Sequence, residues 1–319
     1  MAKYNTRAAG IDTGKRKLDI ALSCGDDVLQ VTNDESGYRE LCDWLRRHKV
    51  KRVGIEASGG YERGVISWLR GRCFVVVVLQ PMQVRAYARF RLRRAKNDKI
   101  DARLIAVCAA ETEHVREASD PRLAALKERL RLIEQIEEDT ARMKTRLEAY
   151  RDQSLIGQLR AEIKRFSEWR RREIKALLAE LVVHADLGRK LELLASIAGV
   201  GQRTALAMLI HMPELGTLTR EQVVSLAGLA PFDNDSAEHS GQRHIWGGRH
   251  RLRRSLYAAA LPAAFHWNDA LIALYRRLIA AGKAHKVALV ACARKLIIYA
   301  NAVLERGTPW VAAEYASER

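Results

Sequence analysis

The sequence predicts an α/β N-terminal domain, a long helical segment after it, and a mainly α-helical C-terminal domain. Three observations support this prediction. Short β-prone runs alternate with helical patterns up to about residue 112, a stretch rich in Leu, Glu, Arg and Lys follows, and the remainder is helical apart from one polar loop. We therefore expect domains at residues 1–112, 113–190 and 191–319.

The N-terminal domain contains four β-prone runs, which lie at Ala8–Ile20, Val28–Thr32, Arg52–Ile55 and Phe74–Leu79. Between them, Gly37–His48 and Tyr61–Leu69 carry apolar residues at helical spacing. Strands that are interleaved with helices in this way indicate a sheet covered by helices.

From about Asp120 to Leu187 the apolar residues step by three and four, and charged residues fill the gaps. This is the pattern of a coiled coil, regular over Leu123–Tyr150 and rougher over Leu155–Leu181. The simplest arrangement is a helical hairpin that projects from the first domain. Two interpretations stay open, namely a plain helical linker packed on one domain and an arm through which two copies dimerise.

Between Glu192 and Gly307 the pattern is helical again, apart from a polar, glycine-rich loop from Pro231 to Gly248. At the start of this helical region, Leu193–Met212 has the pattern helix, Gly-Val-Gly, helix. This pattern resembles the helix-hairpin-helix of many DNA-binding proteins. Glycines let the amides of a helix N-terminus approach a phosphate closely. An ordinary tight turn is the alternative. The residues that we expect to touch nucleic acid here are Gly199, Gly201, Gln202 and Arg203.

The composition favours a polyanionic partner. Lys and Arg number 55 against 38 Asp and Glu, which gives a formal charge of +17. Cations that neutralise phosphates release condensed counterions, so this surplus fits nucleic acid. The longest apolar run, Cys73–Leu79, is too short to cross a bilayer, so no membrane partner is expected.

The five cysteines are scattered and form no CxxC motif, which argues against a disulfide framework and against a zinc site. The start of the chain has no apolar signal core. We therefore expect a cytoplasmic protein with reduced thiols.

Four carboxylates of the first domain are candidate metal ligands. Asp12 and Glu56 each lie in or at the end of an apolar strand, where an acid is costly unless it is paired or binds a cation. Asp98 and Asp101 are three residues apart at the start of a helical pattern, which places them on one helix face. Together they predict a divalent metal site for Mg²⁺ and phosphoryl transfer. Taken singly, each acid could instead be a turn cap, an arginine partner or a helix N-cap.

A basic segment holds two of these acids. Arg85–Arg103 contains eight Lys or Arg and only two acids, Asp98 and Asp101. Such a segment is typical of a site that binds the phosphates of a nucleic acid and cleaves its backbone. The nucleic-acid contacts expected here are Arg85, Arg89, Arg93, Arg94 and Lys96.

The polar loop of the C-terminal domain carries Ser236 in Asn-Asp-Ser, and Ser240 shortly after it. Either serine could be a turn residue that hydrogen-bonds its own backbone, or a nucleophile that attacks phosphorus. Spacing favours Ser236 only weakly. Five arginines lie between Arg243 and Arg254, and they could stabilise charge on the phosphorus. The candidate phosphate contacts among them are Arg243, Arg249 and Arg251.

The chain resembles the DEDD transposases of the IS110 insertion-sequence family over nearly its whole length. In the first domain the resemblance rests on GIDTGKRKLDIAL, GIEASGGYERGV and VLQPMQVRAYARFRLRRAKNDKIDARLIA. In the second half it rests on SIAGVGQRTALAMLI, GLAPFDNDS and SGQRHIWGGRHRLRRSLY, in the family's order. One departure is that Ala237 follows the serine, where the family commonly has glycine.

The resemblance implies a RuvC-like, ribonuclease-H-type N-terminal domain in which Asp12, Glu56, Asp98 and Asp101 hold Mg²⁺. It also implies a coiled-coil segment that assembles protomers, and a C-terminal transposase domain in which Ser236 joins DNA covalently. The partners implied are donor and target DNA and a structured non-coding bridge RNA. Protomers would form a dimer and a tetrameric synaptic complex, in which one protomer's metal site works with another's serine domain.

Two other functions compete with that of an RNA-guided DNA recombinase. A metal-dependent, structure-specific nuclease resembling a junction resolvase would hydrolyse DNA without a protein–DNA adduct. A non-catalytic nucleic-acid-binding protein would show no metal-dependent chemistry. The serine loop among arginines argues against the first, and the presence of all four acids and Ser236 argues against the second.

Overall fold

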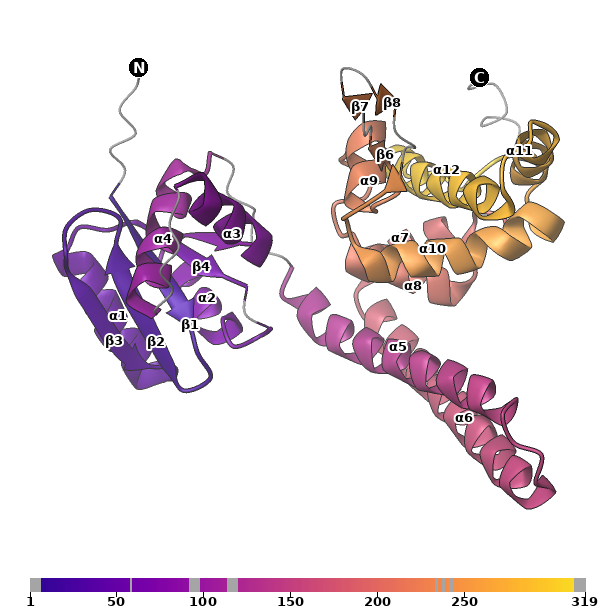
Figure 1. Ribbon diagram of the computed structural model, residues 1–319, viewed down its shortest axis with the longest axis horizontal. Helices are drawn as coiled ribbons and strands as arrows, with labels where there is room; N and C mark the ends of the chain where they lie inside the picture. The colour runs from indigo at the N-terminus through magenta and orange to yellow at the C-terminus, as the bar shows by residue number, and fades with distance from the viewer. Residues whose placement is uncertain are drawn as a thin grey trace. The chain divides into compact units, whose positions relative to one another are not determined.

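The computed structural model of the protein describes residues 7–57, 59–91, 98–113, 120–232, 235–236, 239–240 and 244–312. The chain divides into two compact units, Met1–Ala118 and Ser119–Arg319 (Figure 1). The α/β character of the first unit and the helical character of the second confirm the predicted fold class at that level.

The first unit contains one mixed five-stranded sheet in the order β3-β2-β1-β4-β5. β1, β4 and β5 are parallel to one another, in neighbouring positions. β2 pairs antiparallel with both β1 and β3. The strands are β1 (Ala8–Thr13), β2 (Lys17–Leu22), β3 (Val28–Thr32), β4 (Arg52–Glu56) and β5 (Val75–Leu79).

The sequence run Ala8–Ile20, which reads as one β-prone stretch, forms a hairpin of two strands. A tight turn divides it, because the backbone amide of Gly14 donates to the carbonyl of Lys17 at 2.9 Å. The hairpin pairs Asp12 with Asp19 and Thr13 with Leu18. The hairpin therefore sets the antiparallel strand β2 beside β1, at the edge of the parallel strands β1, β4 and β5.

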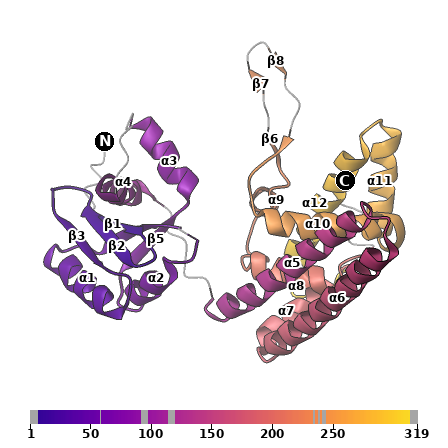
Figure 2. The same ribbon diagram turned by 60° about the horizontal axis from the view of Figure 1, so that its bottom comes forward.

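Helices cover both faces of this sheet. α1 (Glu35–Arg47) and α2 (Arg63–Arg70) lie on one face, while α3 (Pro81–Phe90) and α4 (Asp98–Glu111) lie on the other (Figure 2). Buried side chains of α1 and α2, including Leu41, Leu45 and Leu69, form one core with the strands. α3 and α4 form a second core with β5, so the sheet is the middle of three layers.

The second unit begins with a long hairpin of two helices, α5 (Arg122–Leu147) and α6 (Gln153–Val182). Leu123 and Leu126 of α5 and Leu177 and Leu181 of α6 are buried in the same core as the C-terminal helices. We expected this hairpin to project from the first domain. Instead it belongs to the second unit, because its base is part of that unit's core.

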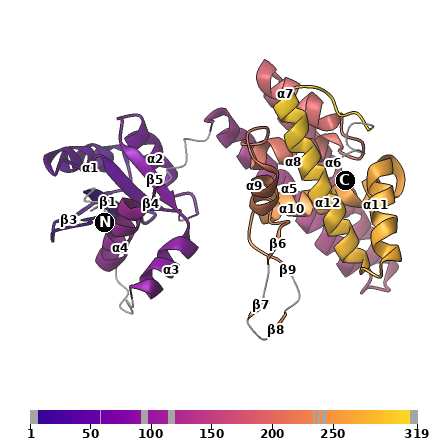
Figure 3. The same cartoon turned by 90° about the horizontal axis from the view of Figure 1, so that it is seen from above.

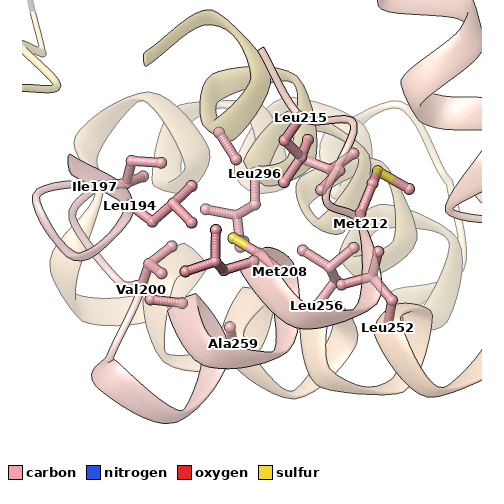
Figure 4. Packing of buried hydrophobic residues seen from close by; sticks show 14 of the residues in the cluster. Leu194, Ile197, Val200, Met208, Met212, Leu215, Leu252, Leu256, Ala259 and Leu296 are labelled. Carbon is pink, nitrogen blue, oxygen red and sulfur yellow. The ribbon is translucent and has the colours of Figure 1, made fainter. Parts of the chain in front are cut away.

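The remaining helices pack around that core. Figure 4 shows side chains of Leu194, Val200 and Met208 in the same apolar cluster as Leu256 and Leu296. The helices are α7 (Ala185–Ala195), α8 (Gln202–His211), α9 (Arg220–Leu226), α10 (His250–Pro262), the π-helical turn η1 (Ala263–Trp267), α11 (Asp269–Ala280) and α12 (His285–Arg306).

One helix among the described residues, α12, is long and apolar enough to cross a membrane by length and composition. Within its most apolar window, 61% is buried inside the protein. α12 packs against α7, α9, α10 and α11 (Figure 3). It is thus the central helix of the second unit's core, and its apolar character follows from that position.

Candidate metal and nucleic-acid sites

Asp12 and Glu56 come to lie side by side at the ends of two neighbouring strands. β1 and β4 are parallel, and Ile11 pairs with Ile55 in their register. The next residue of each strand is the carboxylate, and both carboxylates are half-buried. Because side chains alternate along a strand, Asp12 shares a sheet face with Gly10, and Glu56 shares it with Gly54.

α4 covers that same face, and it does so at very close range. A Cβ atom added to Gly10 would lie 2.1 Å from the carbonyl oxygen of Ala102 and 2.3 Å from the amide nitrogen of Ala106. A Cβ atom added to Gly54 would lie 2.5 Å from the Cβ of Ala109. The two glycines therefore let the helix backbone rest directly on β1 and β4.

The direction of α4 places its first turn at the carboxylate end of the sheet. The Arg52 guanidinium donates to the carbonyls of Ala109, at 2.8 Å, and of Thr112. Since the start of β4 meets the end of α4, the two run antiparallel. The N-terminal turn of α4, with Asp98 and Asp101, consequently lies toward the C-terminal ends of β1 and β4.

Asp101 is half-buried, whereas the side chain of Asp98 lies outside the described part of the structure. Among the described side chains, no group of three or more His, Cys, Asp or Glu is gathered closely enough to hold a metal. The fold thus directs Asp12, Glu56 and the first turn of α4 toward one end of one sheet face. A metal site formed by the four acids stays a prediction. Hard carboxylate oxygens are the donors that Mg²⁺ prefers, so the residue types fit the ion.

A fifth acid, Asp19, lies on this sheet face and was not predicted from the sequence. It pairs with Asp12 across β1 and β2, and directly opposed residues of antiparallel strands share a face. Its carboxylate contacts Lys17 Nζ at 3.0 Å and accepts from Gln30 Nε2 at 2.5 Å. The signal was available in the strand sequence KLDIAL, where the acid alternates with apolar residues.

The basic segment beside the acids is only partly described. Arg85 and Arg89 are exposed on α3. Arg103 of α4 instead contacts Asp26 at 3.1 Å, so it is engaged within the first unit. Three of the predicted contacts, Arg93, Arg94 and Lys96, lie outside the described residues.

The described parts of the serine loop form two short antiparallel strand pairs, which together we call the serine hairpin. β6 (Pro231–Phe232) pairs with β9 (His244–Ile245), and β7 (Asp235–Ser236) pairs with β8 (His239–Ser240). β7 and β8 lie farther from the helices than β6 and β9 (Figures 2 and 3). The register places His239 opposite Ser236 and Ser240 opposite Asp235. Two predicted features of this loop, Ala237 and Arg243, lie outside the described residues.

The root of this hairpin is fixed by glycines and one arginine. A Cβ atom added to Gly248 would lie 2.3 Å from the amide nitrogen of Gly228, so the two backbone segments touch. Both glycines have positive φ, at +66° and +71°. Arg253 Nη1 donates to the carbonyl of Gly228 at 3.1 Å and to that of Gly247 at 2.6 Å. The strands that carry Ser236 therefore leave the helical unit from a defined base.

Comparison with known proteins identifies the family. A model of the DEDD transposases of IS110 type, described as "Transposase", matches residues 9–155. A model described as "Transposase IS116/IS110/IS902 family" matches residues 191–276. The chain belongs to the IS110 family of transposases. The first match spans β1, β4 and α4 with their acids, and the second spans the serine hairpin.

Similar proteins are named for recombination and for mobile elements. Pilin gene-inverting proteins of Moraxella bovis and Moraxella lacunata are each 25% identical over 322 residues, which cover 94% of this transposase and 96% of the relative. The insertion element IS110 uncharacterized 43.6 kDa protein of Streptomyces coelicolor is 36% identical over 118 residues, 36% of this chain and 29% of that protein.

Three arginines of the transposase that we predicted as phosphate contacts are bound by carboxylates of its own second unit. Arg203 donates to both oxygens of Glu137, at 3.0 and 2.8 Å. Arg249 donates to both oxygens of Glu214, at 2.8 and 2.6 Å. Arg251 donates to Glu134 at 2.8 Å. Phosphate contact by these guanidiniums stays a prediction, and the structure gives each of them an internal partner.

Glu134 is the centre of this network. Its side chain is 1% exposed, and one oxygen accepts from Arg251 while the other lies 2.7 Å from His211 Nε2. Burial raises the pKa of Glu134, but the hydrogen bond and charge of His211, followed by Arg251 and Arg203, outweigh burial and lower it. The carboxylate thereby joins three helices, α5 of the hairpin, α8 and α10.

The Gly-Val-Gly segment forms a turn between α7 and α8, as the sequence predicts. Gly199 has φ +93°, which requires glycine, and its Cβ position lies 2.3 Å from the Cβ of Ala263. Gly201 and Gln202, at the start of α8, are exposed. The turn is thus braced on one side by η1 and open at the N-terminus of α8.

Proposed function

We propose that this transposase cuts and rejoins DNA strands, using a Mg²⁺-binding acidic site in a RuvC-like domain and Ser236 as nucleophile. One observation carries the proposal most strongly. The β1–β4 register sets Asp12 beside Glu56, and the close packing of α4 directs its first turn, where Asp98 and Asp101 lie, toward the same end of the sheet. Residues so far apart in the chain serve one site only if such packing unites them.

The acids would hold one or two Mg²⁺ ions, which supply Lewis-acid stabilisation of charge on a scissile phosphate. Asp12 and Glu56 lie on rigid strands, and Asp98 and Asp101 on the first turn of α4. Arg85 and Arg89 of the neighbouring α3 are exposed and would position the phosphate backbone. This order of strands and helix, with antiparallel β1–β3 beside parallel β4 and β5, supports the ribonuclease-H-type assignment.

Ser236 would attack the scissile phosphate through its hydroxyl oxygen. An oxygen–phosphorus bond forms to the serine, the bond from phosphorus to the departing sugar oxygen breaks, and that oxygen takes up a proton. A hydroxyl of a second strand then reverses the step and releases the serine. The hairpin supports this role, because it carries Ser236 away from the helices on a root fixed by Arg253.

The implied partners are donor and target DNA, a bridge RNA and further copies of the chain. The stretch of the α5–α6 hairpin from Glu137 to Ala176 is described throughout, and none of its side chains is buried, although its apolar stripe continues. Met143, Leu147, Leu159 and Ile163 lie half-buried along this stripe. An incompletely covered stripe of this kind supports self-association through the arm. We place the protein in the bacterial cytoplasm, where its DNA lies.

A second candidate function is inversion of a DNA segment. It is favoured by the two Moraxella relatives, which match nearly the full length of the chain and are named pilin gene-inverting proteins. Inversion and transposition use the same strand cleavage and rejoining, and differ in how the two recombining sites are arranged. The chemistry proposed above serves either outcome.

A two-plasmid recombination assay tests the proposal. The protein, Mg²⁺, RNA transcribed from the DNA flanking the gene, and donor and target plasmids are combined, and junctions are sequenced. Wild type should form junctions, and Ser236→Ala and Asp12→Asn should not, although both should still bind DNA. Full exchange by Ser236→Ala would contradict the serine role. Cutting without joining would favour the nuclease.

A further inference from the structure

An exposed aromatic surface lies at the corner where α10 ends and α11 and α12 begin. Trp267 is 68% exposed and Phe265 is 43% exposed, although both are large and apolar. The Phe265 ring lies 4.9 Å from the Tyr275 ring, and Tyr275 lies 5.8 Å from His285, centroid to centroid. Phe265, Tyr275 and His285 form one cluster of rings, and Trp267 lies close to Phe265 in the sequence. Exposed apolar clusters mark interaction sites.

This corner is held rigidly. Trp267 ends the π-helical turn η1, and the next residue, Asn268, is fully buried. The Asn268 side chain donates to the carbonyl of Ala198 at 3.0 Å and accepts from the amide of Leu271 at 3.2 Å. The backbone next to Trp267 is therefore fixed by hydrogen bonds, and little conformational entropy is lost when a ligand stacks on the indole ring.

The same contacts join the aromatic surface to the Gly-Val-Gly turn. Ala198, which accepts from Asn268, directly precedes that turn, and Gly199 rests on Ala263 of η1. The exposed residues Gly201 and Gln202 therefore belong to the same end of the second unit as Trp267. A nucleic acid that meets the turn would therefore approach the end of the second unit that also carries Trp267.

The charge around the surface is positive. Three exposed cations lie nearby: Arg276 on α11, Lys283 between α11 and α12, and Lys286 on α12. From Arg254 to Leu304 the sequence contains a single acid, Asp269. Aromatic rings among cations are the combination with which proteins bind single-stranded nucleic acid, because rings stack on bases and cations meet phosphates.

We propose that this corner, defined by Phe265, Trp267, Tyr275 and His285, binds unpaired bases of single-stranded DNA, with Trp267 as the principal stacking residue. The inference rests on the proposed function for its choice of DNA, since strand exchange separates duplex strands near the protein. Trp267 stacks on a base face, Phe265 and Tyr275 support the neighbouring position, and the lysines meet the backbone. Duplex DNA offers no free base face along its length and is not the ligand of this surface.

Binding to labelled oligonucleotides tests this without requiring recombination. The full-length protein is titrated against a 15-nucleotide oligo(dT), the matching oligo(rU) and a duplex, and fluorescence anisotropy gives each Kd. Trp267→Ala should weaken oligo(dT) binding about tenfold, the loss expected for one stacked base. Trp267→Phe should stay within about threefold of wild type, since a ring remains. Duplex binding should be unchanged by either variant.

Three controls make the result specific. Tyr61→Ala removes an exposed aromatic side chain from the first unit and should leave oligo(dT) binding at the wild-type level. A plot of the logarithm of the oligo(dT) binding constant against the logarithm of salt concentration should keep its slope in Trp267→Ala, because stacking releases no counterions. Oligo(dT) carrying 5-iododeoxyuridine should cross-link on irradiation to the peptide that contains Trp267.

Unchanged oligo(dT) affinity in Trp267→Ala would overturn the inference, as would an equal loss for duplex. Tighter binding of oligo(rU), with no measurable oligo(dT) binding, would show that the surface takes RNA. A change in oligomeric mass alone would make it an interface between copies. If Trp267→Ala binds normally while wild type recombines, only this inference fails. If Trp267→Ala loses oligo(dT) while wild type never recombines, only the proposed function fails.

Discussion

Gly10 of β1 touches the backbone of Ala106 in α4, since a Cβ atom on the glycine would lie 2.3 Å from the Ala106 amide nitrogen. The contact fixes the helix on the sheet face that carries Asp12 and Glu56. A backbone atom cannot swing aside as a flexible side chain can, so any larger residue must displace the helix. The geometry of the acidic site therefore depends on a residue with no functional group.

Gly10→Ala should destabilise the first unit and impair its acidic site together. Overpacking of this kind costs about 1–3 kcal/mol, and it would move Asp98 and Asp101 relative to the strands. Urea unfolding and the recombination assay measure the two effects. Gly157→Ala is the matched control, because nothing lies within 4 Å of its added Cβ and alanine favours helix α6. Wild-type stability and activity in Gly10→Ala would show that α4 does not position the site.

Glu134→Gln should lower the free energy of unfolding by about 3 kcal/mol near neutral pH, because it removes the buried carboxylate that Arg251 and His211 contact. Glu138→Gln is the control. Its partner Arg254 lies 2.7 Å away but half exposed, and the expected loss is below about 1 kcal/mol. Equal effects of the two substitutions would mean that burial does not set the strength of the Glu134 network.

The same Glu134 variant should change how stability depends on pH. The folded-state pKa of Glu134 lies below its ordinary value of 4.5, so its contribution is present above that pH and is lost as pH falls through the folded pKa. The difference in unfolding free energy between wild type and Glu134→Gln should therefore shrink below about pH 4.5. Denaturant titrations from neutral pH into acid measure it, and a difference that grew in acid would contradict the assignment.

Arg253→Ala should reduce recombination about tenfold or more, because it frees the root of the hairpin that carries Ser236. DNA affinity should change little, as the guanidinium is engaged by two backbone carbonyls. Arg254→Ala provides the comparison, since the neighbouring guanidinium is half exposed and pairs only at the surface with Glu138. If both variants lose activity equally, the loss reflects lost positive charge and not the root of the hairpin.

Four of the five thiols should fall into two classes of reactivity. Cys24 and Cys73 are exposed, whereas Cys42 and Cys292 are buried. Burial raises the pKa of the Cys292 thiol to about 11, which suppresses its thiolate at neutral pH. A thiol-reactive dye should label the first pair quickly in the native protein and the second only after unfolding. Rapid labelling of Cys292 would mean that α12 does not lie in a closed core.

Local patterns were enough to predict much of the fold. Val28–Thr32 matches β3, and the apolar stripes through Leu123 and Leu177 match α5 and α6, because strand and helix periodicities are local properties. The glycine at position 14 also signalled the turn that divides Ala8–Ile20, but the prediction treated that run as one. The hairpin's attachment to the second unit depends on tertiary packing, which no periodicity reports.

The candidate acidic residues could be chosen from the sequence, whereas the contacts of the basic residues could not. Asp12 and Glu56 stood out because a carboxylate in an apolar strand is costly. Arg251 could not be assigned in the same way, because its partner Glu134 lies 117 residues away in the sequence. The position of His239 opposite Ser236 follows from the pairing of β7 with β8, and this residue was not singled out from the sequence.

The most direct test of the central claim is a search for a covalent protein–DNA adduct. Protein, Mg²⁺, RNA from the flanking DNA and labelled donor and target DNA are incubated and separated on a denaturing protein gel. Our account predicts a labelled protein band in wild type that is absent in Ser236→Ala and lost in Asp12→Ala. Cleaved DNA without such a band, or an undiminished band in Ser236→Ala, would contradict the assignment of Ser236 as nucleophile.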